Sequence, residues 1–171
     1  MEKLTSLAAV AQADAQVLIL GSMPGRQSLA QQQYYAHPRN AFWKIIANLF
    51  GFNSDASYAD KLLFLQQHKL ALWDVIQSCE RHGSLDSNIK NISIISNDFA
   101  GFFSLHPKIK HIFFNGSLAY QQYQQRVKPQ LSEVLQSLPC TRLPSTSPAM
   151  ASLSFEQKLI IWSEIKQVLG G

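Results

Sequence analysis

Short apolar runs alternate along the chain with longer amphipathic segments. Residues 17–20 and 70–73 are apolar runs typical of buried strands, residues 110–114 are similar to a third strand, and residues 140–143 can form a fourth. Apolar residues at helical spacing predict helices over 40–50, 58–68, 97–103, 117–125 and 155–169. Because strands alternate with helices, we expect an α/β fold. The expected form is a three-layer sandwich with a central, mostly parallel four-stranded sheet flanked by helices.

Small and polar residues follow each predicted strand. These segments are residues 21–25, Asp74, Asn115–Gly116 and residues 143–149. The carboxyl ends of parallel strands share one edge of a sheet, so we expect the functional site there. Gly21 and Gly25 lack the spacing and the following lysine of phosphate-binding loops, so no nucleotide cofactor is expected.

The composition indicates one globular domain over residues 1–171. Hydrophobic residues make up 46% of the chain and charged residues 15%, a balance that excludes disorder. The net charge of +4 favours anionic partners such as nucleic acid.

Two cysteines, Cys79 and Cys140, are far apart and form no pattern with the five histidines. The sequence therefore predicts neither a disulfide framework nor a metal site, and a reducing cytoplasm is the expected location. Apolar runs also stay well short of the roughly 20 residues of a membrane span, so we expect no membrane partner.

Five motifs, taken together, resemble the uracil-DNA glycosylase superfamily and, within it, the hypoxanthine (deoxyinosine) DNA glycosylase branch. They are Gly-Ser-Met-Pro-Gly at 21–25, Tyr-Tyr-Ala-His-Pro-Arg-Asn-Ala-Phe-Trp-Lys at 34–44, Leu-Trp-Asp-Val at 72–75, Phe-Asn-Gly at 114–116 and Leu-Pro-Ser-Thr-Ser-Pro-Ala at 143–149. The resemblance implies a monomeric, monofunctional glycosylase without metal or cofactor. Its partner would be double- or single-stranded DNA, from which it flips a deaminated base and hydrolyses the N-glycosidic bond.

The expected catalytic residues lie in the second motif. Many relatives carry a catalytic Asp or Asn in the first motif, where this chain has Ser22 and Met23. The resemblance assigns the positioning of water to Asn40 instead, although Asn40 is also well placed to cap the helix that follows. His37 can protonate the leaving base, or it can simply bond to the backbone of its loop.

Other motif residues are expected to hold the flipped base. By resemblance one of Tyr34 and Tyr35 stacks on it, with Tyr35 favoured by its position, while at least one of the pair packs under the loop. Asp74 would accept the N1–H of hypoxanthine or the N3–H of uracil, or would cap a turn. Asn115 either contacts the base or serves only the Asn-Gly turn. The expected substrate-binding set is Gly21, Ser22, Met23, Pro24, Gly25, Tyr35, Asp74 and Asn115.

The last motif is expected to grip DNA, unless it is only a Ser-Pro turn. Relatives often carry a histidine there that this chain lacks, so backbone N–H groups would have to replace it. Met150, or else Leu153, is the expected apolar wedge, with core packing as the alternative. The expected DNA-binding residues are Arg39, Ser145, Thr146, Ser147 and Met150.

Three other functions stay open at this point. A G:U or G:T mismatch-specific glycosylase would use the same motifs. A nucleic-acid-binding module without catalytic activity would fit a first motif that lacks the catalytic Asp or Asn of many relatives. A hydrolase of free nucleosides would also hydrolyse an N-glycosidic bond but would not bind DNA.

Overall fold

The four predicted strands form one parallel sheet. The computed structural model describes residues 2–170, and its larger sheet has the strand order β3-β2-β6-β7 with all neighbours parallel. These strands are β2 (Val17–Gly21), β3 (Leu70–Asp74), β6 (His111–Asn115) and β7 (Cys140–Leu143). Gly21 pairs with Asp74 and Asn115 pairs with Leu143, so all four carboxyl ends lie along one edge.

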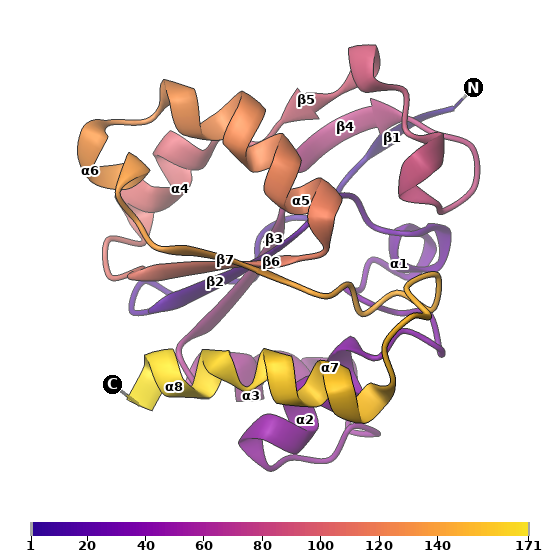
Figure 1. The fold of residues 1–171 in the computed structure, drawn as a ribbon, viewed down its shortest axis with the longest axis vertical. Helices are drawn as coiled ribbons and strands as arrows, with labels where there is room; N and C mark the ends of the chain where they lie inside the picture. The colour runs from indigo at the N-terminus through magenta and orange to yellow at the C-terminus, as the bar shows by residue number, and fades with distance from the viewer. Residues whose placement is uncertain (1, 171) are drawn as a thin grey trace.

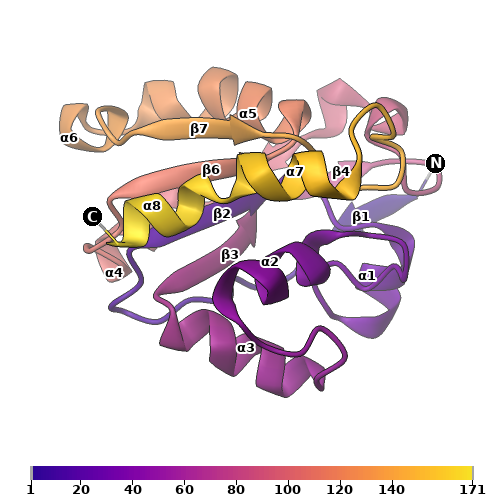
Figure 2. The ribbon, with the colours of Figure 1, turned by 60° about the horizontal axis from the view of Figure 1, so that its bottom comes forward.

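Helices cover both faces of this sheet, which confirms the predicted three-layer α/β sandwich. Figures 1 and 2 show α4 to α6 on one face and α2, α3, α7 and α8 on the other. Val17 and Ile19 pack toward α2, whereas Leu18 and Leu20 pack toward α4 and α5, because successive strand side chains point to opposite faces. The helices are α1 (Arg26–Gln31), α2 (Phe42–Phe50), α3 (Tyr58–Gln67), α4 (Phe99–Leu105), α5 (Ser117–Gln122), α6 (Glu133–Gln136), α7 (Phe155–Trp162) and α8 (Glu164–Gly170).

The C-terminal helix differs from the prediction. The expected helix over 155–169 is divided at Ser163 into α7 and α8. The Ser163 hydroxyl donates to the carbonyl of Ile160, a local bond that competes with the helical ladder. The start of α7 is fixed by a capping box between Ser154 and Gln157. A π-helical turn, η3 (Tyr123–Val127), continues α5, and 3-10 turns form η1 (Asp86–Asn88), η2 (Asn91–Ser93) and η4 (Lys128–Gln130).

A second, antiparallel sheet was not predicted from the sequence. Its order is β1-β4-β5, with strands β1 (Lys3–Thr5), β4 (Ile76–Glu80) and β5 (Ile95–Ser96). Only Val75 separates β3 from β4, so the chain passes directly from one sheet into the other. β1 and β5 are too short to give a readable pattern, and β4 is as long as β2 but mixes polar and apolar residues instead of forming an apolar run. The small sheet places the loop of residues 81–88 beside the carboxyl end of the parallel sheet.

Two further features bear on the sequence expectations. Cys79 and Cys140 are both free, and Cys79 is buried in β4. Within residues 2–170, no helix has both the length and the apolar character needed to cross a bilayer.

Candidate active site

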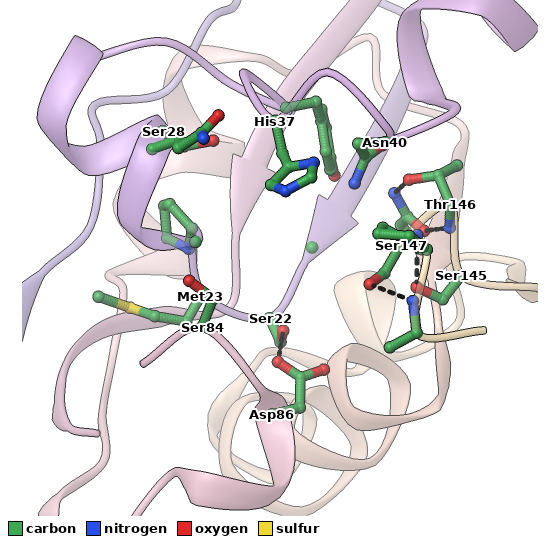
Figure 3. Close-up of a pocket in the computed structure, with 18 of the residues that line it drawn as sticks. Ser22, Met23, Ser28, His37, Asn40, Ser84, Asp86, Ser145, Thr146 and Ser147 are labelled. Carbon is green, nitrogen blue, oxygen red and sulfur yellow. Dashed lines mark hydrogen bonds between the residues drawn. The ribbon is translucent and has the colours of Figure 1, made fainter. Parts of the chain in front are cut away.

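A cavity of about 720 Å³ opens at the edge where the parallel strands end. This volume lies in the range of small-molecule sites. Every residue of the expected catalytic, substrate-binding and DNA-binding sets lines it, whereas Leu153, the alternative wedge, does not; Figure 3 shows several of the lining residues around the opening. The lining residues already predicted are Gly21, Ser22, Met23, Pro24, Gly25, Tyr35, His37, Arg39, Asn40, Asp74, Asn115, Ser145, Thr146, Ser147 and Met150. The structure therefore brings the five motifs together, and the role of each residue stays a prediction.

Gly21 ends β2 at the inner part of the cavity. A Cβ atom at this position would lie 2.5 Å from Oδ1 of Asp74 and 3.0 Å from the hydroxyl of Tyr35. Both distances are too short for a side chain. The absence of a side chain at Gly21 therefore allows Asp74 and Tyr35 to approach the end of the strand.

Asp74 is a buried carboxylate, only 3% exposed, at the end of β3. Its Oδ2 atom has no hydrogen-bond partner among the described residues, and no turn N–H donates to the side chain there, so the capping alternative does not hold. Burial, together with the nearby charge of Asp86, raises the pKa of Asp74 to about 7, although Arg81 opposes the shift. A carboxyl group in this state can accept a hydrogen bond from a bound ligand near neutral pH.

The two neighbouring tyrosines have different environments, as expected. Tyr34 is 3% exposed and its hydroxyl donates to the carbonyl of Ala8, so it packs under the loop. Tyr35 adopts the left-handed conformation with φ 54° and stacks on Phe42 at a centroid distance of 4.1 Å. Its buried hydroxyl has no hydrogen-bond partner among residues 2–170, and burial raises the pKa of Tyr35 so that the phenol stays protonated. Because Phe42 covers one ring face, a base can meet only the remaining face and the hydroxyl.

Asn40 lies just before α2 and faces the cavity. Its Oδ1 accepts from the backbone N–H of Phe42 at 2.9 Å, while the cap position itself is occupied by Ala41. The capping alternative is therefore wrong: Asn40 lies one residue before the cap, and its side chain closes a turn onto Phe42 at the start of the helix. Figure 3 shows the amide nitrogen of Asn40 directed toward the opening, where it is available to donate. The N–H of Ala41 donates to the carbonyl of Thr146, which ties this loop to the last motif.

His37 is held by its own loop and also lines the cavity. Its Nδ1 accepts from the N–H of Arg39 at 3.1 Å, so the neutral ring carries its hydrogen on Nε2. The bond to the loop backbone is therefore present, and the role of His37 in protonating a leaving base stays a prediction. Arg39 is exposed beside the opening.

Asn115 and Thr146 join β6 to the last motif. Nδ2 of Asn115 donates to Oγ1 of Thr146, and the N–H of Thr146 donates to Oδ1 of Asn115, both at 2.9 Å. Thr146 is 1% exposed, which does not fit the prediction that it grips a phosphate. The pair instead fixes the loop, while Ser145 and Ser147 are only half-buried. Gly116 has φ 98°, a value that favours glycine, at the turn after Asn115.

The loop of residues 81–88 forms a wall that sequence reasoning missed. Three hydrogen bonds join it to residues 22–26. Ser22 Oγ donates to Asp86 Oδ1 at 2.9 Å, and the N–H of Arg26 donates to Ser84 Oγ at 2.9 Å. Arg81 Nη2 donates to the carbonyl of Pro24 at 2.8 Å. The only sequence signal was the turn composition of residues 83–88. Within residues 2–170, no group of three His, Cys, Asp or Glu side chains is arranged to hold a metal ion.

Comparisons with known proteins agree with this geometry. A family model described as the uracil DNA glycosylase superfamily matches residues 8–166. Two similar proteins are named hypoxanthine DNA glycosylase. The one from Methanosarcina acetivorans is 41% identical over 112 residues, which are 65% of this chain and 70% of that protein. The one from Methanosarcina barkeri is 36% identical over 104 residues, which are 60% of this chain and 65% of that protein.

A solved structure has the same fold. It is the NMR structure of a candidate uracil DNA glycosylase from Methanosarcina acetivorans, with a TM-score of 0.82 and 32% identity. The match covers 99% of this chain and 100% of that one. On the sequence match over residues 8–166 and this agreement in fold, the chain belongs to the uracil DNA glycosylase superfamily.

Proposed function

We propose that this protein is a monofunctional DNA glycosylase that removes a deaminated base, with hypoxanthine as the main substrate and uracil as a second one. The observation that carries the proposal is the unpartnered carboxylate of Asp74 in the cavity at the strand ends. The names of the two Methanosarcina relatives support the choice of hypoxanthine.

Asp74 provides the chemical basis for recognising the base. Hypoxanthine presents an N1–H donor and uracil an N3–H donor, whereas adenine and cytosine present an acceptor at the same ring position. A buried carboxylate oxygen without a partner favours a base that donates a hydrogen bond to it. Adenine or cytosine would place a ring-nitrogen acceptor against this oxygen, and both acceptors would then stay unsatisfied. Discrimination therefore follows from the cost of an unmade hydrogen bond.

Asn40 and His37 are placed to assist bond cleavage. As the bond between the sugar C1′ and the base nitrogen lengthens, the electron pair leaves with the base and the sugar becomes cation-like. The amide of Asn40 can orient the attacking water, and the Nε2–H of His37 can donate to the departing base. Neither role requires a metal or a cofactor.

The rim of the cavity supplies the grip on DNA. Arg26 and Arg39 are exposed cations at the opening, and Ser145 and Ser147 offer hydroxyl groups there. These groups suit phosphate oxygens of a strand from which one base has been extruded. Flipping costs a few kcal/mol and costs least for a poorly paired base, which favours deaminated bases as substrates.

One panel of oligonucleotides tests the proposed function. Duplexes that contain inosine, uracil, xanthine or mismatched thymine are incubated with the protein in EDTA, and alkali then reveals abasic sites. We expect cleavage of the inosine duplex first. Free inosine and binding without turnover are measured in parallel. Cleavage of free inosine alone would indicate a nucleoside hydrolase, and binding without cleavage of any duplex would indicate a silent module.

Met150 gives a prediction about base flipping. The side chain is half-buried at the rim, and its backbone carbonyl accepts from Lys158. If Met150 fills the space left by the extruded base, Met150→Ala lowers cleavage of paired inosine about tenfold more than cleavage of single-stranded inosine, which has no stack to refill. Single-turnover rates on the two substrates measure this ratio.

A control for Met150 comes from the loop of residues 81–88. Leu85 also lines the cavity and is 51% exposed, so Leu85→Ala removes an apolar side chain from another part of the rim. We expect a smaller difference between paired and single-stranded substrates for this variant. Equal losses on both substrates for Met150→Ala would exclude it as the wedge.

A further inference from the structure

The cavity contains two acidic side chains in different positions. Among the described residues that line it, only Asp74 and Asp86 are acidic. Asp74 is 3% exposed and lies beside Gly21 at the strand ends. Asp86 is exposed and belongs to the loop of residues 81–88. The chain thus places one carboxylate deep in the site and a second one nearer the rim, on a residue that is exposed as a whole although neighbouring atoms surround its carboxyl group.

Asp86 is held in a fixed position at this rim. Its Oδ1 accepts from the hydroxyl of Ser22 at 2.9 Å, which leaves the other carboxylate oxygen free of that bond. The loop that carries it is anchored by Arg81, a side chain 1% exposed that donates to the carbonyls of Pro24 and Gly83. Figure 3 shows the carboxylate of Asp86 beside Ser22 below the opening. Such anchoring is what a positioned charge requires.

The geometry of base extrusion assigns different partners to the two carboxylates. A flipped base enters with its ring edge first, while its sugar stays attached to the DNA strand at the surface. A carboxylate in the interior therefore meets the base, and a carboxylate at the rim meets the sugar. Positive charge develops on the sugar as the glycosidic bond breaks, so a negative group at the rim stabilises the transition state.

We propose that Asp86 is a further catalytic residue, whose carboxylate faces the deoxyribose and takes the proton of the attacking water. This inference rests on the proposed function. The bond between C1′ and the base breaks with its electron pair on the base, and the water oxygen bonds to C1′. One water proton passes to Asp86, and the base anion accepts a hydrogen bond from the Nε2–H of His37 and takes its proton from solvent. The products are the free base and an abasic sugar.

The electrostatic surroundings of Asp86 fit this role. Burial of its carboxylate by neighbouring atoms raises the pKa of Asp86, while the bond from Ser22 and the charge of Arg81 lower it. The pKa of the group is raised on balance, which makes the carboxylate a better proton acceptor than a free one. The guanidinium of Arg81 bonds to backbone carbonyls, and no ion pair with Asp86 forms among the described residues.

A purely structural role for Asp86 makes a different prediction. Asp86→Asn keeps an oxygen that accepts from Ser22 and removes only the charge. Ser84→Ala removes a different hydrogen bond between the same two loops and keeps both carboxylates. If Asp86 acts by its charge, Asp86→Asn lowers the single-turnover rate on inosine DNA about 10²-fold, and Ser84→Ala stays within about threefold of the parent. A rate retained in Asp86→Asn, or an equal loss in Ser84→Ala, would overturn the proposal.

A binding measurement keeps the test independent of turnover. Duplexes that contain a cationic pyrrolidine or a neutral tetrahydrofuran in place of the deoxyribose differ in one positive charge at the sugar. The parent protein should bind the cationic duplex at least about tenfold more tightly, and Asp86→Asn should lose this preference while Asp74→Asn keeps it. Should the parent protein cleave no duplex, the proposed function fails, and this preference still decides the role of Asp86. Equal preference in the parent and Asp86→Asn would refute the role.

Discussion

Replacement of Asn40 by alanine should lower single-turnover release of hypoxanthine about 10²-fold or more. The amide faces the cavity, and a positioned polar group of this kind contributes that much to a transition state. The variant should still bind inosine DNA, because the exposed arginines and the rim hydroxyls are unchanged. Rates under enzyme excess and binding to an abasic-site duplex separate the two effects.

The bond from Phe42 to Asn40 provides the control. Its loss should cost about 1 kcal/mol, and a melting temperature a few degrees lower should report it. Asn40→Ser keeps an oxygen for the N–H of Phe42 and removes the amide. Wild-type stability with a low rate in this variant would confirm a role in catalysis. Recovery of both stability and rate would assign Asn40 to structure alone and leave Asp74 and His37 as the next candidates.

Asp74→Asn should lower excision of hypoxanthine about 10²-fold, because it replaces a charge-assisted acceptor with a neutral amide that has one acceptor oxygen. Since the ionised form accepts most strongly, the parent rate should rise with pH through about 7, the pKa of Asp74. The variant should lose this rise. A pH profile of single-turnover rates measures it, and an unchanged profile would exclude Asp74 as the group that reads the base.

The same substitution should increase stability at high pH. The pKa of Asp74 is about 7 in the fold against 3.8 in the unfolded chain, so between these values the folded state holds the proton more tightly. The stability contribution of Asp74 is therefore complete below pH 3.8 and is lost as the pH rises toward 7, by about 4 kcal/mol in all. Asp74→Asn should melt at a higher temperature than the parent at pH 8, and the difference should shrink toward pH 4. Thermal melts across this range test the sign.

The strands and most of the site could be predicted from the sequence because they depend on local pattern. Short segments of four or five residues, most of them rich in apolar side chains, predicted all four parallel strands, and residues that line the cavity follow each of them. Parallel strands must end at a common edge, so Gly21, Asp74 and Asn115 were expected to lie close together before any distance was known. The helical pattern of residues 155–169 did not predict the break at Ser163, where the hydroxyl donates to the carbonyl of Ile160 between the last two helices.

The tertiary structure decided which side chains are free to act. Thr146 and Ser147 look alike in the sequence, yet Thr146 is buried against Asn115 across 31 residues of chain. Asp86 reaches the site through a bond to Ser22 across 64 residues, from a loop placed by a second sheet that the sequence pattern did not reveal. The protonation of Asp74 depends on how completely other segments exclude water from it. Burial, long-range hydrogen bonds and shifted pKa values arise only when distant segments pack together, and a pattern read along one segment contains no record of them.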